Sequence, residues 1–231
     1  KNLLNKGALT ISGKTIEENL KKIIKKENDV IKDFDNPIKQ NAGFLVLRSN
    51  FFDSAIMKMS VVGPEFKKRY LSNGETPNSF TVKAIVFDGP EHYHKEINNP
   101  ELKIDENCIL IIRGCGPIGY PGAAEVVNMQ PPDYLLKKGI SSLPCLGDGR
   151  QSGTSESPSI LNVSPEAAIG GGLSILKNGD LIKIDLTSKR VDLLLDEKDI
   201  AVRKNNTNFK FPNNQTPWQE IARKFTGQLS D

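Results

Sequence analysis

The sequence predicts an α/β fold, namely a mixed β-barrel with flanking helices, similar to a swivelling domain and preceded by a short helical segment. Three observations support this class. Short apolar, β-rich runs recur along most of the chain, helical patterns are fewer and interspersed, and turns rich in glycine or proline separate the runs. A chain of 231 residues is long enough for one large domain, or for a domain with an appendage.

Residues 1–41 differ in pattern from the rest of the chain. Thr15 and Glu18 have the spacing of a capping box, and apolar residues recur at helical spacing over 20–24 among lysines. We therefore expect this segment to be an exposed helix and a linker rather than a core of its own. A separate β-barrel domain is expected over 42–231.

From residue 43 onward the apolar runs are short and β-rich, which is typical of buried strands. The Asn178-Gly179 pair is a strong signal for a hairpin turn between two of them. The predicted strands cover 43–47, 80–87, 108–112, 140–146, 173–176, 181–186 and 191–195.

Helical patterns interrupt these runs at a few places. The last is the clearest, because Thr216 is a suitable N-cap, Pro217 takes the first helical position and Gln219 completes a capping box. The predicted helices cover 123–129, 133–138, 165–168, 197–204 and 217–225.

The composition excludes several classes of function. The formal net charge of +3 is too small to indicate nucleic-acid binding. No apolar run is long enough to span a bilayer, and no secretory signal is visible. We expect a cytoplasmic protein, or a mitochondrial one in a eukaryote. Because the chain does not begin with Met, we also expect it to be part of a longer protein.

The cysteines and histidines do not form a recognisable metal motif. Cys108, Cys115 and Cys145 are widely spaced and odd in number, which fits a reducing compartment rather than a disulfide framework. Cys108 is expected to be a buried strand residue, whereas the other two either pack or line a site. His92 and His94 either share one strand face as ligands or, as we favour, are solvated loop residues beside a proline.

The loop over 147–159 is the most informative feature of the chain, because it combines glycines, hydroxyls, an acid and a base. It lies between a predicted strand and a predicted helix, where loops commonly hold an anion or a reactive hydroxyl. Asp148 is expected to cap turns. Arg150 binds either a loop carbonyl or a substrate carboxylate, and phosphate binding by this loop is one alternative function.

A second glycine-rich loop, over 113–125, follows a predicted strand and enters a predicted helix. Glu125 falls in the first turn of that helix, so it either stabilises the helix or serves as a hard oxygen ligand for Mg²⁺. The Gly-x-Gly-x-x-Gly spacing that begins at Gly114 is weak evidence for a dinucleotide, because Pro117 lies within the turn.

Together with several further motifs, these loops resemble the C-terminal part of the dihydroxy-acid and sugar-acid (aldonate) dehydratase family. The resemblance covers nearly the whole chain, and the order and spacing of the motifs are highly specific. The residues at 128–132 and around Gln151 are similar to the pentonate and hexonate branch, which includes L-arabinonate and D-xylonate dehydratases. The matching motifs are Arg48-Ser49-Asn50, 54–58, 86–90, 119–132, 147–159 and 164–168.

The resemblance implies a hydro-lyase (dehydratase) in which a 2,3-dihydroxy acid loses water to give a 2-keto-3-deoxy acid through an enol. It also implies a [2Fe–2S] cluster as Lewis acid on the departing C3 hydroxyl, and Mg²⁺ bound to the carboxylate and the C2 oxygen. By the same resemblance, Ser152 is the alkoxide base at C2, Thr154 and Arg150 bind substrate, and Glu125 is a magnesium ligand. Glu156 departs from the small residue that this branch carries.

The resemblance places the cluster cysteines and the remaining magnesium ligands in an N-terminal domain that is missing here. It also implies that residues 1–41 are the tail of that domain and that 42–231 are its swivelling β-barrel partner. None of the cysteines of this chain matches a cluster ligand, so we expect the chain alone to be inactive and to hold no iron–sulfur cluster. The full enzyme is expected to join this barrel to the N-terminal domain and to form a dimer or tetramer. The alternative from another class of function is a non-catalytic binding or scaffold barrel with the same fold.

Overall fold

The structure is a computed structural model that describes residues 4–24, 30–72, 74–123, 125–150, 158–210 and 216–229. The chain divides into two compact units, Lys1–Asn41 and Ala42–Asp231. The first unit contains the short helix α1 (Ile16–Leu20), which begins at a capping box between Thr15 and Glu18 as predicted.

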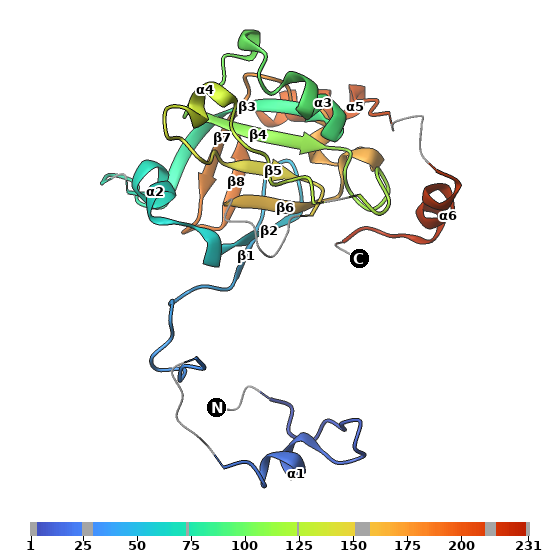
Figure 1. Cartoon of the computed structure of the whole chain (residues 1–231). Helices are drawn as coiled ribbons and strands as arrows, with labels where there is room; N and C mark the ends of the chain where they lie inside the picture. Colours follow the sequence, from blue (N-terminus) through green and yellow to red (C-terminus); the bar gives the residue numbers. More distant parts are fainter. Residues whose placement is uncertain are drawn as a thin grey trace. The chain divides into compact units, whose positions relative to one another are not determined.

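The second unit is built on a mixed sheet, which comprises eight strands over the described residues (Figure 1). The strands are β1 (Phe44–Leu47), β2 (Ser54–Lys58), β3 (Ser79–Asp88), β4 (Cys108–Arg113), β5 (Cys145–Gly147), β6 (Ser159–Ser164), β7 (Leu181–Asp185) and β8 (Arg190–Leu193). Their order in the sheet is β1-β2-β6-β5-β4-β3-β7-β8. The pairs from β3 to β6 are parallel, and the pairs on either side are antiparallel.

The two outer strands of this sheet meet, so the sheet closes into a barrel. Arg48, next to β1, bridges to Arg190 at the start of β8. The Arg48 N–H donates to the Lys189 carbonyl at 3.0 Å, and the Arg48 carbonyl accepts from the Val191 N–H at 2.9 Å. The predicted mixed β-barrel is therefore confirmed, and its closure pairs the strand edges that would otherwise be open to other chains.

Short helices flank the barrel, and the capping box of the last one, between Thr216 and Gln219, is present as predicted. No helix in the described ranges is both long and apolar enough to cross a membrane. The helices are α2 (Pro64–Phe66), α3 (Gly89–Glu96), α4 (Asp133–Leu136), α5 (Glu197–Asn206) and α6 (Pro217–Phe225). Shorter 3-10 or π turns occupy Met59–Val61, Lys67–Leu71, Pro100–Leu102, Ala167–Ile169 and Gly172–Ile175.

The central strand β4 is buried on both faces, because the barrel interior lies on one side and a helical layer on the other. Ile109 and Ile111 join the interior cluster, to which the other strands also contribute. Leu110 and Ile112 alternate with them and join a second cluster that includes Ile97 and Leu135, from the end of α3 and from α4. A strand covered on both faces reads as a continuous apolar run, which is why the sequence identified β4 correctly.

The helix predicted over 123–129 is wrong, because the described residues of this stretch are irregular. Val127 and Met129 are buried while the described residues beside them are exposed or half-buried, which is the period-two pattern of an extended segment. The Val127 N–H donates across to the Arg150 carbonyl at 3.4 Å, a partner that lies outside any local helix.

The strand predicted over 173–176 is also wrong, because the chain there forms a 3-10 turn. Arg113 explains the difference, since its Nη1 donates to the carbonyls of Leu173, Ser174 and Leu176, each at 3.0 Å. Carbonyls that converge on one guanidinium do not pair with a neighbouring strand.

Both histidines lie in α3, so neither the loop nor the strand predicted for them is correct. Two residues apart on a helix, His92 and His94 point in different directions and do not form a pair of ligands. His92 Nδ1 instead accepts from the Asp88 N–H at 2.9 Å, next to the start of the helix.

Asn50, just after β1, forms hydrogen bonds to β8 where the barrel closes. Its Nδ2 donates to the Leu193 carbonyl at 2.8 Å, and its Oδ1 accepts from the Leu193 N–H at 2.9 Å.

Asn50→Ala should lower the free energy of unfolding by about 2 kcal/mol, because Leu193 loses both partners. Urea unfolding measures this, with Asn107→Ala at an exposed position as the control. An equal loss in the two variants would contradict the role of Asn50.

Candidate active site

Two loops leave the barrel at neighbouring parallel strands. The first follows β4 and begins at Gly114, and the second follows β5 and begins at Asp148. Because β4 and β5 are parallel, both loops start at the same edge of the sheet, which is where α/β proteins commonly bind ligands. In Figure 1 this edge lies at the arrowheads of the two strands, on the side of α6.

Glu125 of the first loop lies next to Arg150 of the second. Arg150 Nη1 is 3.6 Å from Glu125 Oε1, and Arg150 Nε donates to the Ala123 carbonyl at 3.5 Å. The side chains of Arg150 and Glu125 are 63% and 40% exposed, so the pair adds little stability and both groups remain accessible. Arg150 therefore contacts a loop carbonyl, and its binding of substrate stays a prediction. Glu125 lies outside any helix, so the helix-stabilising interpretation is wrong.

The catalytic hydroxyl predicted at Ser152 lies outside the described residues, as does the substrate-binding hydroxyl predicted at Thr154. Their roles stay predictions. The described part of the same loop ends at Arg150, beside Glu125, and resumes at Pro158.

Asp148 joins the bases of the two loops. Its carboxylate accepts from the Gly114 and Cys115 N–H groups, each at 2.9 Å, and from the Ala167 N–H at 3.0 Å. The side chain is buried, and burial raises its pKa to about 6, a rise that the three N–H groups partly offset and the nearby Glu166 reinforces. The predicted turn-capping role is correct, and it extends to an adjoining segment of the chain.

Glu166 is a second buried carboxylate, and although it belongs to the motif over 164–168, no role is predicted for it from the sequence. It accepts from the Ile118 N–H at 2.9 Å and from the Gly119 N–H at 2.8 Å. The Gln228 side chain closes over it, donating from Nε2 to Glu166 Oε1 and accepting from the Glu166 N–H. A Cβ on Gly116 would collide with this carboxylate, so glycine is required there. The partners are more than 40 residues apart in sequence, so no local pattern reveals them.

A cavity of about 150 Å³ opens between the two loops. Cavities that enclose a whole small-molecule ligand usually measure about 300 Å³ or more. This cavity is therefore too small to be a complete site, and it forms only part of one. Its lining includes Cys115, Tyr120, Asp148, Arg150, Asn162 and Leu229.

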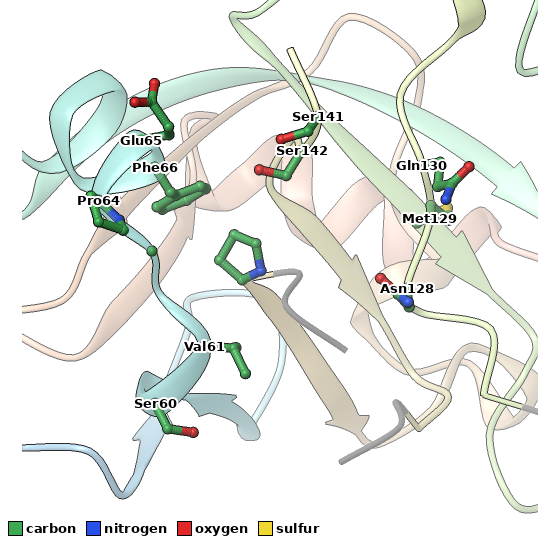
Figure 2. Close-up of a pocket in the computed structure, with 12 residues that line it drawn as sticks. Ser60, Val61, Pro64, Glu65, Phe66, Asn128, Met129, Gln130, Ser141 and Ser142 are labelled. Carbon is green, nitrogen blue, oxygen red and sulfur yellow. The ribbon is translucent and has the colours of Figure 1, made fainter. Parts of the chain in front are cut away.

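A larger hollow of about 660 Å³ lies elsewhere on the barrel, between the start of α2 and the segment that follows Glu125. Figure 2 shows the Ser141 and Ser142 hydroxyls directed toward Phe66, with Asn128 and Gln130 on the other side of the hollow. Its lining mixes hydroxyls and amides with apolar side chains and Glu65, and Pro158 places it beside the end of the second loop.

The three cysteines have the character of buried, protonated thiols. Burial raises the pKa of the Cys108 thiol to about 11, and burial beside Asp148 raises that of Cys115 further. Cys145 Sγ donates to the carbonyls of Met129 and Leu143. Iron–sulfur clusters are held by cysteines gathered at one site, and these three thiols belong to no such group among the residues that the structure describes.

The described residues also contain no group of three His, Cys, Asp or Glu side chains arranged to hold a metal ion. Glu125 nevertheless fits one position of a magnesium site, because it is an accessible carboxylate with only a long ion pair. The remaining ligands would have to come from outside the described part of the chain.

Helix α6 is attached to the first loop through its polar side. Gln219 Nε2 donates to the Pro121 carbonyl at 3.2 Å, and Arg223 Nε donates to the Ile118 carbonyl at 2.7 Å. The Trp218 and Phe225 side chains of the helix are 79% and 86% exposed. The helix therefore contacts the candidate site while leaving large apolar groups in water.

The raised pKa of Asp148 predicts how stability depends on pH. Asp148 binds its proton more tightly in the folded state than in the unfolded chain, where the pKa of Asp is about 3.9. Protonation of Asp148 therefore stabilises the fold fully below about pH 4, and this contribution is lost as the pH rises through about 6. The free energy of unfolding should fall by about 3 kcal/mol over this range. Urea unfolding at several pH values should show this slope in the wild type and not in Asp148→Asn. Equal slopes in both proteins would contradict it.

A closed mixed barrel whose two candidate-site loops follow neighbouring parallel strands defines the class of domain. Comparison with known proteins then places it: the family model "dihydroxy-acid/6-phosphogluconate dehydratase C-terminal" matches residues 29–231, and the chain belongs to this family. The predicted resemblance is therefore confirmed.

Individual relatives agree with this family and with its sugar-acid branch. The chain is 59% identical to D-xylonate dehydratase of Caulobacter vibrioides, over 98% of the chain and 38% of the relative. It is 39% identical to L-arabinonate dehydratase of Rhizobium leguminosarum bv. trifolii, over 87% of the chain and 33% of the relative. It is 36% identical to dihydroxy-acid dehydratase of Clostridium kluyveri, over 89% of the chain and 34% of the relative. The chain thus spans between a third and two fifths of the length of these relatives.

Proposed function

We propose that this chain is the C-terminal half of a hydro-lyase that dehydrates a sugar acid to a 2-keto-3-deoxy acid. The observation that carries this proposal is the 59% identity to a D-xylonate dehydratase over 98% of the chain. That name favours a pentonate as substrate. Because the chain spans only 38% of that relative, the activity is assigned to a longer protein, and the chain alone is proposed to be inactive.

The proposed reaction begins at C2 of the substrate. The Ser152 alkoxide takes the C2 proton, the electrons of the C2–H bond form the C2–C3 double bond of an enol, and the C3 hydroxyl leaves as hydroxide. The hydroxide takes a proton from solvent to become water, and Ser152 returns the C2 proton to solvent, which restores the alkoxide. The enol then becomes the keto acid by tautomerisation. A serine hydroxyl is a weak base by itself, so nearby positive charge and loop N–H groups must stabilise its anion. Arg150 and Thr154 are proposed to hold the substrate in this loop.

Glu125 is proposed to be the magnesium ligand of this chain. When bound, Mg²⁺ supplies positive charge that stabilises the substrate carboxylate and the developing charge at the C2 oxygen. The cysteines here do not fit a [2Fe–2S] cluster, so the steps proposed for residues of this chain use no cluster bound by it. We propose that the cluster ligands and the other magnesium ligands belong to an N-terminal domain.

The proposal extends to the assembly and the compartment. The longer enzyme is proposed to be a homo-oligomer, a dimer or tetramer, in a reducing compartment such as the cytoplasm. Three cysteines that form no disulfide are consistent with that environment.

The test is turnover by the full-length protein that contains this chain, supplied with Mg²⁺ and either D-xylonate or L-arabinonate. A 2-keto acid should appear in step with substrate loss, detected by the ultraviolet absorbance of its semicarbazone, and the 231-residue chain alone should produce none. Failure of the full-length protein on a panel of pentonates and hexonates would favour the scaffold-barrel alternative. Stoichiometric iron in the purified chain alone would contradict the placement of the cluster.

A further inference from the structure

Two buried carboxylates hold the first loop of the candidate site in its observed shape. Asp148 and Glu166 are both 1% exposed. Between them they accept from five backbone N–H groups, four of which belong to the short segment 114–119. A carboxylate that accepts several backbone N–H groups fixes the backbone more firmly than neutral hydrogen bonds do.

Neither carboxylate forms an ion pair with a Lys or Arg side chain among the residues that the structure describes. Arg113, a cation at the end of the same strand β4, is engaged by Asp88 at 2.6 Å and by the carbonyls near residue 174. Buried charge without a cation is costly and is tolerated only where hydrogen bonds satisfy it. The retention of two such charges beneath one loop therefore requires a reason beyond packing.

We propose that Asp148 and Glu166 are positioning residues that shape loop 114–119 and thereby present Glu125 to a divalent cation. This inference rests on the proposed function and assigns to it two buried carboxylates. Asp148 lies two positions before Arg150, the partner of Glu125, and it binds the first residues of the loop that leads to Glu125. Loss of its charge therefore disturbs both sides of the Glu125–Arg150 contact.

The order of the bonds along the chain supports a role in shaping the loop. Asp148 binds the N–H groups of Gly114 and Cys115, where the loop leaves β4, and Glu166 binds those of Ile118 and Gly119. Gly114 has φ +76°, a left-handed conformation that other residues rarely adopt, so the backbone there needs firm partners. Supporting groups of this kind commonly change metal affinity by about 10- to 100-fold when removed.

The experiment measures metal binding directly, in the full-length protein, with Mn²⁺ as a paramagnetic substitute for Mg²⁺. Free Mn²⁺ is counted by its electron paramagnetic resonance signal during a titration. Asp148→Asn and Glu166→Gln keep the shape of each side chain but turn an amide NH₂ toward backbone donors. Each should weaken Mn²⁺ binding about 10-fold and raise the Mg²⁺ concentration for half-maximal turnover by a similar factor.

The control is Asp192→Asn, which removes a structural carboxylate of β8 that accepts from the Asn50 N–H at 3.0 Å and pairs with Arg190. It should lower the melting temperature and leave Mn²⁺ affinity unchanged. Unchanged affinity in both site variants, or an equal loss in the control, would overturn the inference. If Glu125→Gln itself leaves Mn²⁺ binding intact, the assignment of Glu125 as the metal ligand in the proposed function fails instead.

A second measurement covers the case in which neither site variant folds. Hydrogen exchange of the wild-type full-length protein should show strong protection of the N–H groups in segment 114–119 that the two carboxylates accept from. Protection at the level of the barrel strands supports the inference. Exchange as fast as in exposed loops overturns it, because the carboxylates would then not be holding the loop.

Discussion

Ser152→Ala in the full-length enzyme is expected to lower kcat for a pentonate by about 10³-fold, because no other group is proposed to take the C2 proton. The affinity for substrate should change little, since the hydroxyl acts on the proton rather than holding the carboxylate. Steady-state kinetics with separate kcat and KM values measures this. The melting temperature should match the wild type, because the change deletes a single hydroxyl and no apolar group.

The matched control is Ser155→Ala, three positions along the same loop. We expect nearly wild-type turnover from it, because this serine is assigned no part in the reaction. Comparable losses in the two variants would mean that the loop is sensitive to any change, and Ser152 would lose its assignment as the base. Exchange of the C2 hydrogen with solvent deuterium gives a further check, since it should cease in Ser152→Ala alone.

Glu125→Gln has the second largest expected effect. Mg²⁺ prefers charged oxygen ligands, so replacing the carboxylate by an amide should raise the Mg²⁺ requirement by about 100-fold. Folding should be unaffected, because within the described part of the chain Glu125 forms only the long, exposed ion pair with Arg150. Turnover measured against Mg²⁺ concentration, together with a urea unfolding curve, separates the two effects.

Glu65→Gln serves as the control, because Glu65 is an exposed carboxylate that lines the separate, larger hollow. It should leave the Mg²⁺ requirement unchanged. If excess Mg²⁺ fails to restore turnover in Glu125→Gln while Mn²⁺ still binds normally, the residue acts on the substrate rather than on the metal.

The barrel was largely predictable because local pattern and burial agree along most of its strands. The run over 108–112 is apolar at every position, and it forms β4, which is covered on both faces. The prediction failed where a distant side chain decides the backbone. Asn178-Gly179 does form a turn, with φ +91° at Gly179. The turn joins β7 to a 3-10 segment instead of a strand, because Arg113 donates hydrogen bonds to the carbonyls of that segment.

The candidate site was predictable only in part, for a similar reason. The loops carry recognisable motifs, so Glu125 and Arg150 were selected from sequence, and the structure places them together. The sequence predicts no role for Glu166, because its partners come from the first loop and from Gln228 near the end of the chain. A lone glutamate after a proline has no local feature that distinguishes a buried support from a surface residue.

The position of Trp218 determines what fluorescence can report about this domain. It is the only tryptophan of the chain, and on α6 its indole is already surrounded by water. Melting of the barrel will therefore leave the indole emission nearly unchanged, while burial of α6 by a second surface will shift it to the blue. Tyr70, buried and bonded to the Glu106 carbonyl at 2.7 Å, is the chromophore that will follow the barrel itself.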